Sequence, residues 1–152
     1  MVNNTKPAPD IFLKACEELS VIPEERKVKM KPTVVKNSEV ELRKMAEGCI
    51  CKILFDSENG AGNFSIGTVI IEPNSRTGEH TRNVEELIFA LKGETYVITE
   101  DEEYKLEQGD SILIPAGIKH YHANKSNGTI EQIYLFAPQG PEKSLRDLEI
   151  II

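Results

Sequence analysis

The chain has few basic residues and no long apolar run, and each shortage excludes a class of protein. Lysine and arginine number 18 against 25 aspartate and glutamate residues, which gives a net charge of −7. Nucleic acids and anionic membranes require a basic face, so we expect neither as a partner. No apolar stretch reaches the length of a transmembrane helix, and the first residues lack the apolar core of a signal peptide.

Cysteine, tryptophan and the other aromatic residues are also scarce. The three cysteines are an odd number in a chain without an export signal, which predicts reduced thiols and a cytoplasmic location. Tryptophan is absent and aromatic residues make up 6% of the chain, but 39% hydrophobic and 28% charged residues are typical of a soluble globular protein. A length of 152 residues is enough for one domain with a buried core.

The start of the chain differs from the rest in its periodicity. Apolar residues recur at helical spacing from Phe12 to Leu19, after a helix start signal at Pro9. This pattern predicts one short amphipathic α-helix within an N-terminal segment, residues 1–25, followed by a single β-barrel domain over residues 26–152.

Beyond the predicted helix the periodicity falls to two, and turn signals recur at short intervals. Runs of Asp, Ser, Asn and Gly separate short apolar segments, most clearly at residues 56–62. Short strands with frequent turns are typical of an all-β sandwich or barrel, and a jelly roll is one closed form of it. The predicted strands are a first one around Val28, Met30 and Val34–Val35, then Cys49–Phe55, Phe64–Glu72, Leu87–Leu91, Thr95–Thr99, Tyr104–Leu106, Ser111–Ile114, His120–Asn124 and Thr129–Phe136.

The end of the chain leaves two alternatives open. Residues 138–152 begin with proline and glycine and finish in the apolar run Leu148–Ile152. A tail of this kind on a small β domain suits either strand exchange with a second copy or packing against its own barrel. We expect a homodimer.

Histidines gather in two polar clusters beside apolar runs. His120 and His122 follow a Pro-Ala-Gly stop at positions i and i+2, so on a strand they point to the same face. His80 and Arg82 have the same spacing and precede Glu86. Two strands that present imidazoles or carboxylates to one interior supply what a metal site inside a barrel needs.

The cluster around His120 resembles the second motif of the cupin superfamily. From Gly109 to Asn124 its residues have the spacing G-x5-P-x-G-x2-H-x3-N, with His120 as the histidine. The resemblance covers about residues 60–137. It implies the cupin-like double-stranded β-helix, a jelly-roll barrel with a narrow pocket at one mouth.

The first cluster resembles the first cupin motif, H-x-H-x3-E-x6-G, with two departures. His80, Glu86 and Gly93 match it. Arg82 stands where the family has its second histidine, and Asn74 stands where the family usually has a glycine. The first departure falls on a position that the family uses to bind metal.

The resemblance implies a divalent metal held by His80, Glu86 and His120. These three form a 2-His-1-carboxylate set, which suits Fe(II), Mn, Ni or Zn and leaves positions open for substrate or oxygen. Arg82 is permanently charged and weakens a cation site, but it is well suited to bind an anionic group of a substrate. His122 is expected to line the pocket as a second substrate-binding residue, with a role as a fourth metal ligand as the alternative.

A metal-free arrangement is the alternative to the metal site. In it Arg82 pairs with Glu86 and forms a hydrogen-bonded polar cluster with His80 and His120. The metal-bound form would be an enzyme acting on a small polar or anionic molecule, by family resemblance a dioxygenase or a sugar isomerase. The metal-free form would be a non-catalytic module that binds or senses a small molecule.

A second resemblance covers residues 6–25. The stretch is similar to a segment of haloacid-dehalogenase-type phosphatases in which the lysine equivalent to Lys6 neutralises phosphate. The nucleophilic aspartate motif has no counterpart, and Val28–Lys31 replaces the acidic pair expected downstream. Because a lysine alone cannot carry out phosphoryl transfer, we interpret the segment as a packing helix.

Overall fold

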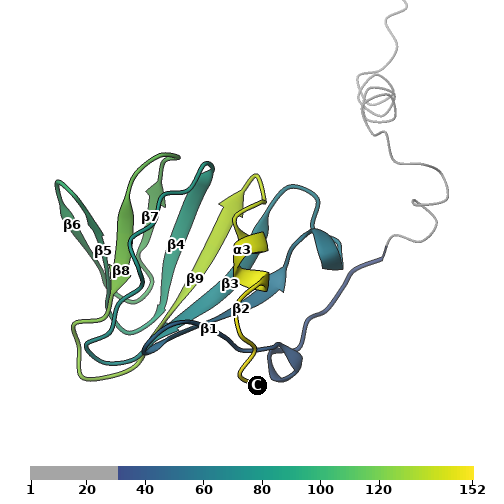
Figure 1. Ribbon diagram of the computed structural model, residues 1–152, viewed down its shortest axis with the longest axis horizontal. Coiled ribbons are helices and arrows are strands. Elements are labelled where there is room, and N and C mark those ends of the chain that lie inside the picture. The colour runs from purple at the N-terminus through teal and green to yellow at the C-terminus, as the bar shows by residue number, and fades with distance from the viewer. Residues whose placement is uncertain (1–30) are drawn as a thin grey trace, which may run out of the picture. The chain divides into compact units, whose positions relative to one another are not determined.

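Short strands joined by turns form two antiparallel sheets in the computed structural model, which describes residues 31–152 (Figure 1). The larger sheet has the order β1-β2-β3-β9-β4-β7, and the smaller sheet has the order β6-β5-β8. Non-consecutive neighbours such as β3 and β9 show that the chain crosses back and forth, as in a jelly roll. The strands are β1 (Arg43–Ala46), β2 (Cys49–Phe55), β3 (Ser65–Ile71), β4 (Glu85–Lys92), β5 (Thr95–Thr99), β6 (Glu103–Leu106), β7 (Ser111–Ile114), β8 (His120–Ala123) and β9 (Ile130–Ala137).

The core lies between the inward faces of the two sheets. Strand β9 shows the reason most clearly, because every second side chain from Ile130 to Phe136 is buried and those between are half-buried. The start of β2 follows the same rule, which places the free Cys49 and Cys51 on the buried face with the half-buried Ile50 between them. The buried apolar side chains form one cluster: Cys49, Cys51, Val69, Ile71, Ile88, Ala90, Val97, Leu106, Ile114, Ile130, Tyr134, Phe136 and Leu145.

Two polar residues of the second motif fix the turns around β7 and β8. Asp110 follows Gly109, whose φ of 94° favours glycine, and accepts a hydrogen bond from the Glu107 backbone N–H at 2.9 Å. Asn124 ends β8 and donates its amide to the carbonyl oxygens of Ile71 at 2.9 Å and Gly128 at 2.7 Å. Asp110 therefore closes the turn before β7, and Asn124 fixes the chain directly after β8.

The predicted strands from Cys49 to Phe136 agree with the structure to within two residues at each end, but the start of the barrel does not. Residues 31–36 have no regular structure, so the strand predicted at Val34–Val35 is wrong. Among residues 31–152 the first strand is β1, which lacks apolar alternation and forms because it pairs with β2. The predicted N-terminal helix and the phosphatase-like segment, both within residues 1–30, lie outside the described residues.

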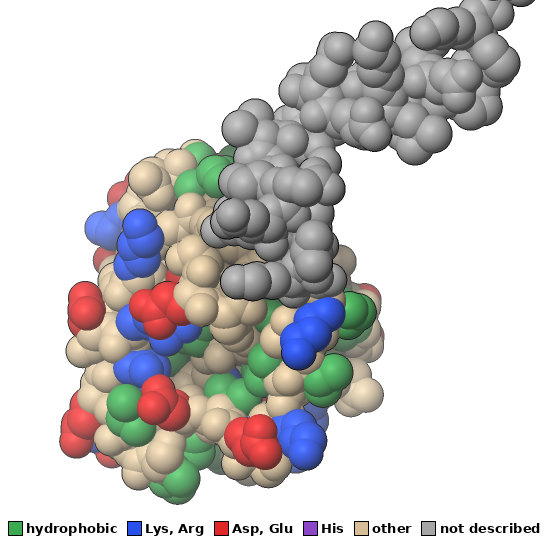
Figure 2. Space-filling view, turned by 90° about the vertical axis from the view of Figure 1, so that its right-hand side faces the viewer, with side chains coloured by type: hydrophobic (Ala, Val, Ile, Leu, Met, Phe, Trp, Pro, Cys, Tyr) green, Lys and Arg blue, Asp and Glu red, His purple; other side chains and the backbone are tan. Residues whose placement is uncertain are grey.

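The C-terminal tail pairs with its own barrel. The backbone N–H of Lys44 donates to the Glu149 carbonyl at 2.9 Å, and the N–H of Ile151 donates to the Leu42 carbonyl at 2.8 Å. The tail thus extends the larger sheet beyond β1, which is the second of the two alternatives left by the sequence. In the described residues, no helix is long and apolar enough to span a membrane. On the face in Figure 2, acidic and basic side chains are interspersed among apolar ones.

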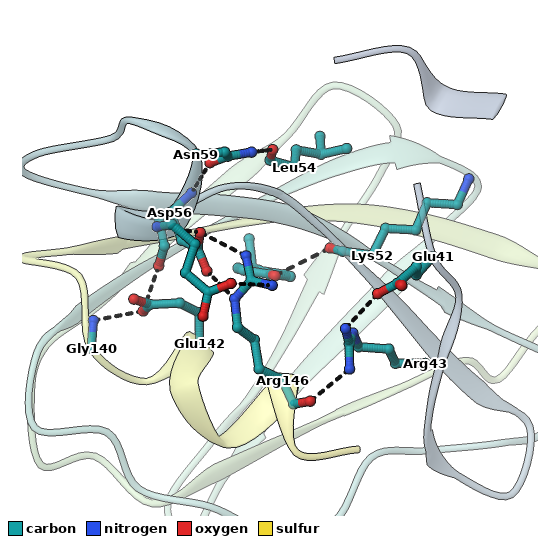
Figure 3. A network of polar contacts seen from close by, with 12 residues as sticks. Glu41, Arg43, Lys52, Leu54, Asp56, Asn59, Gly140, Glu142 and Arg146 are labelled. Carbon is teal, nitrogen blue, oxygen red and sulfur yellow. Dashed lines mark hydrogen bonds and ion pairs between the residues drawn. The ribbon is translucent and has the colours of Figure 1, made fainter. Parts of the chain in front are cut away.

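A short helix, α3 (Glu142–Arg146), is anchored to the barrel by two buried carboxylates (Figure 3). Asp56, after β2, is 1% exposed and accepts hydrogen bonds from Arg146 Nε at 2.6 Å and Nη2 at 2.7 Å. Glu142 accepts hydrogen bonds from Ser65 Oγ at 2.9 Å and from the Gly140 N–H at 2.6 Å. These contacts keep Leu145 of α3 in the core.

The Asp56–Arg146 pair predicts a pH-dependent stability. Hydrogen bonds from Arg146 hold the pKa of Asp56 below its ordinary value, so the pair stabilises the fold above about pH 4 and loses this effect as the pH falls. At pH 7 Asp56→Asn should lower the free energy of unfolding by about 3 kcal/mol, because it removes the buried charge that accepts two hydrogen bonds from Arg146. Urea unfolding should show that the difference between wild type and variant shrinks toward pH 3.

The matched control is Glu58→Gln, because Glu58 also contacts Arg146, at 2.9 Å, but its side chain is 63% exposed. Its loss should cost less than about 1 kcal/mol at either pH. Equal effects of the two variants, or an Asp56→Asn deficit that stays constant with pH, would contradict this account.

Candidate metal centre

Backbone pairing brings the two histidine clusters together. His80 lies between β3 and β4 and exchanges two hydrogen bonds with His120 of β8, each 2.9 Å from backbone nitrogen to carbonyl oxygen. Within β8 the side chains alternate, so His120 and His122 are both buried on the inner face, as predicted. Glu86, the second residue of β4, faces the same interior and is 3% exposed.

Three imidazoles converge on the Glu86 carboxylate. His120 Nε2 is 3.0 Å and His80 Nε2 is 3.9 Å from Oε2 of Glu86, while His122 Nε2 is 3.5 Å from Oε1. One ligand atom from each of the four residues lies within 4.8 Å of every other. The predicted set of His80, Glu86 and His120 is therefore assembled, and His122 joins it as the fourth member.

Hydrogen bonds to the backbone fix the orientation of two of these rings. Nδ1 of His80 is 2.9 Å from the Gly78 carbonyl oxygen, and Nδ1 of His120 is 2.8 Å from that of Ile118. A carbonyl oxygen only accepts, so Nδ1 carries the proton in both rings. Each Nε2 is left as the atom that faces Glu86. Metal-binding histidines are held in the same way in proteins.

The charges at the cluster favour a cation in its centre. Burial lowers the pKa of His80 to about 4, so its ring is neutral near pH 7. Burial alone would raise the pKa of Glu86, but the neighbouring His120 and His122 side chains outweigh it and lower that pKa well below the usual range. The carboxylate is therefore ionised and needs a positive partner, either a metal ion or a second proton on His120.

The spacing of the ligand atoms fits a metal ion. Bonds of about 2.1 Å to nitrogen and oxygen imply ligand separations of roughly 3.0 to 3.5 Å around one ion. The separations of His120 and His122 from Glu86, 3.0 and 3.5 Å, lie in this range, and that of His80, 3.9 Å, is slightly longer. A set of three imidazoles and one carboxylate suits Fe, Mn, Ni or Zn, the metals expected from the sequence.

Arg82 lies beside the cluster without entering it. Its guanidinium carbon is 5.3 Å from the centre of the Phe136 ring, and its Nε is buried with no hydrogen-bond partner. Within residues 31–152 there is no ion pair between Arg82 and Glu86, so the pairing on which the metal-free alternative depends is not formed. His122 supplies the imidazole that Arg82 does not.

A small cavity of about 10 Å³ adjoins three of the four residues, His80, Glu86 and His122. Arg82 and His122 line it, as the sequence predicts for the pocket, together with Gln132 and the apolar side chains of Phe136 and Leu145. Sequence reasoning missed Gln132. Its position in β9, two residues from the buried Ile130, was the signal that could have shown it to face the interior.

The fold and this site define a small domain of the cupin superfamily. Residues 67–136 match the family model of the cupin domain. This part of the chain is therefore a cupin domain, as the two motifs indicated.

Known proteins similar to the chain include two linked to polyketides. It is 26% identical to the polyketide synthase CurC of Streptomyces cyaneus over 118 residues, 77% of each chain. The polyketide cyclase RemF of Streptomyces resistomycificus superposes with a TM-score of 0.65, at 21% identity over 73% of this chain and 82% of that one. A sugar phosphate isomerase of Silicibacter pomeroyi superposes with a TM-score of 0.63, at 17% identity over 72% and 77% of the two chains. At these identities the structural likeness shows the fold.

Metal content tests the cluster directly. Wild-type protein purified without a histidine tag should take up about one divalent ion per chain, measured by mass spectrometry. Glu86→Ala should weaken uptake by more than about tenfold, because it removes the only negative ligand of the group. His120→Ala should do the same.

Glu85→Ala is the matched control, because Glu85 precedes Glu86 in β4 but is exposed on the outer face. It should bind as much metal as the wild type. If Glu85→Ala and Glu86→Ala retain equal amounts, the bound ion is held elsewhere.

Proposed function

We propose that this chain is a metal-dependent cupin enzyme in which His80, Glu86, His120 and His122 hold one divalent ion. The observation that carries the proposal is the convergence of three Nε2 atoms on one ionised, buried carboxylate. The Nδ1 bonds of His80 and His120 support it, because they leave both Nε2 lone pairs facing the same point. A polar cluster without metal would need an extra proton at that point.

We further propose a class of reaction, the removal of a proton next to a carbonyl group. Ring closure in a polyketide and aldose–ketose interconversion of a sugar phosphate both begin with this step. The similarity to CurC, RemF and the sugar phosphate isomerase therefore supports a shared chemistry rather than one named substrate. A bound divalent ion supplies Lewis acidity toward a carbonyl oxygen.

The chain's own residues bind the substrate and exclude water. Arg82 carries a permanent positive charge and suits a carboxylate or phosphate group through paired hydrogen bonds. Phe136 and Leu145 close the inner side of the site with apolar surface. The side chain of His80 is 19% exposed, against 1% and 4% for His120 and His122, so a substrate approaches from the His80 side.

Exchange of substrate protons with solvent tests the proposed reaction. In D2O the ion-loaded wild type should catalyse deuterium exchange into dihydroxyacetone phosphate, followed by NMR. Arg82→Met should lower kcat/KM for this probe roughly 10- to 100-fold, because it removes charged hydrogen bonds to phosphate. With uncharged dihydroxyacetone the variant should lose less than with the phosphate, because this probe has no phosphate group for Arg82 to bind.

Arg76→Met is the matched control, since Arg76 is exposed and its guanidinium lies 4.4 Å from the centre of the Tyr121 ring. It should leave the exchange unchanged. An ion-loaded wild type that exchanges neither probe would contradict the proposed reaction. Oxygen uptake by the iron-loaded protein would then support the dioxygenase, whereas a chain that binds no ion would support the non-catalytic binding module.

A further inference from the structure

Three hydrogen-bond donors around the metal cavity lack an acceptor among the residues that the structure describes. They are Nε of Arg82, Nε2 of Gln132 and Nδ1 of His122, and all three are buried. The three residues line the same cavity of about 10 Å³. A buried donor without an acceptor costs free energy, so three at one cavity indicate a place where an acceptor atom binds.

Gln132 is held in a fixed orientation. It lies on β9 and is 0% exposed, and Thr95 Oγ of β5 donates a hydrogen bond to its Oε1 at 2.9 Å. This contact joins the two sheets and occupies the amide oxygen. The NH2 group is then the part of the side chain without a partner, and it can only donate.

His122 differs from the other two imidazoles in its Nδ1 atom. In His80 and His120 this atom bonds a backbone carbonyl, whereas in His122 it has no partner in the described part of the chain. When Nε2 of His122, which faces Glu86, holds the metal ion, the proton of the neutral ring lies on Nδ1. The ring therefore presents a ligand atom on one side and a donor on the other.

The volume of the cavity limits the size of the group that can accept hydrogen bonds from these donors. A volume of about 10 Å³ is close to that of one water-sized group, so the cavity itself holds one oxygen atom. We propose that Gln132, together with Arg82 and His122, binds one oxygen atom of the substrate beside the metal ion. The substrate class is then a carbonyl compound with oxygens on two neighbouring carbons, such as an α-oxo acid, with one oxygen on the ion and the other on these donors. This inference rests on the proposed function.

Oxalate is the probe that tests this role, because it carries oxygens on two neighbouring carbons and cannot react. The metal content of each protein is measured first, and oxalate is then titrated calorimetrically into the ion-loaded form. Gln132→Met keeps a side chain of similar size but has no donor. It should retain the ion and bind oxalate at least about tenfold more weakly than the wild type.

Two further variants make the result specific. Gln139→Met repeats the substitution at a glutamine that bonds the Gly62 carbonyl at 3.0 Å, away from the cavity, and it should bind oxalate as the wild type does. Thr95→Val leaves Gln132 in place but removes the hydrogen bond that orients it, so it should weaken oxalate binding by a smaller factor. Thr95→Val also carries the test if Gln132→Met does not fold.

The possible outcomes separate this inference from the proposed function. Equal oxalate affinity in wild type and Gln132→Met, or no oxalate binding by ion-loaded wild type, overturns the role of Gln132 and leaves the metal site standing. Loss of the ion in Gln132→Met but not in Gln139→Met also overturns it, because Gln132 would then support the ion. If the metal-content measurement shows that the wild type takes up no ion, the proposed function is overturned before oxalate is added. The role of Gln132 is then overturned as well, because it rests on the proposed function.

Discussion

The ionised carboxylate of Glu86 is the constraint on which the rest of the site depends. It is 3% exposed, and such a charge stays inside a protein only when positive or donor groups surround it. Strand β4 places it in the interior, and β8 and the backbone of His80 bring three imidazoles to within 4 Å of its oxygens. Because two of those rings donate their Nδ1 protons to carbonyl groups, their Nε2 atoms do not neutralise the charge in the neutral form, and either a metal ion or a further proton has to do so.

Helix α3 and its anchoring residues close the cavity that adjoins this cluster. Asp56 and Glu142 anchor α3 to the barrel, and α3 in turn places Leu145 against the cavity beside Phe136. The result is a small space lined on one side by the polar side chains of the cluster and on the other by apolar side chains. Interactions between charges are stronger in such a site than in water, which suits the stabilisation of charge developing on a carbonyl oxygen.

Much of this fold could be predicted from the sequence, because its strands alternate and its turns use Gly, Asp and Pro. The same alternation placed His120 and His122 on one face. Strand β1 could not be predicted, since Arg43–Ala46 has no apolar alternation and forms only through pairing with β2. The Arg82 guanidinium lies over the ring of Phe136. The amide of Gln132 is oriented by a hydrogen bond from Thr95 in the other sheet. Such contacts between distant residues leave no mark in a single sequence.

The central claim is that three imidazoles and Glu86 hold one ion. X-ray absorption spectroscopy of the zinc-loaded protein tests it most directly, because the scattering of imidazole rings reveals how many histidines bind the metal. The account predicts three imidazoles and light oxygen ligands at about 2.0 to 2.1 Å, and two imidazoles in a His122→Ala variant. A wild-type spectrum with two imidazoles that His122→Ala leaves unchanged would contradict the account, since His122 would then lie outside the metal's ligands.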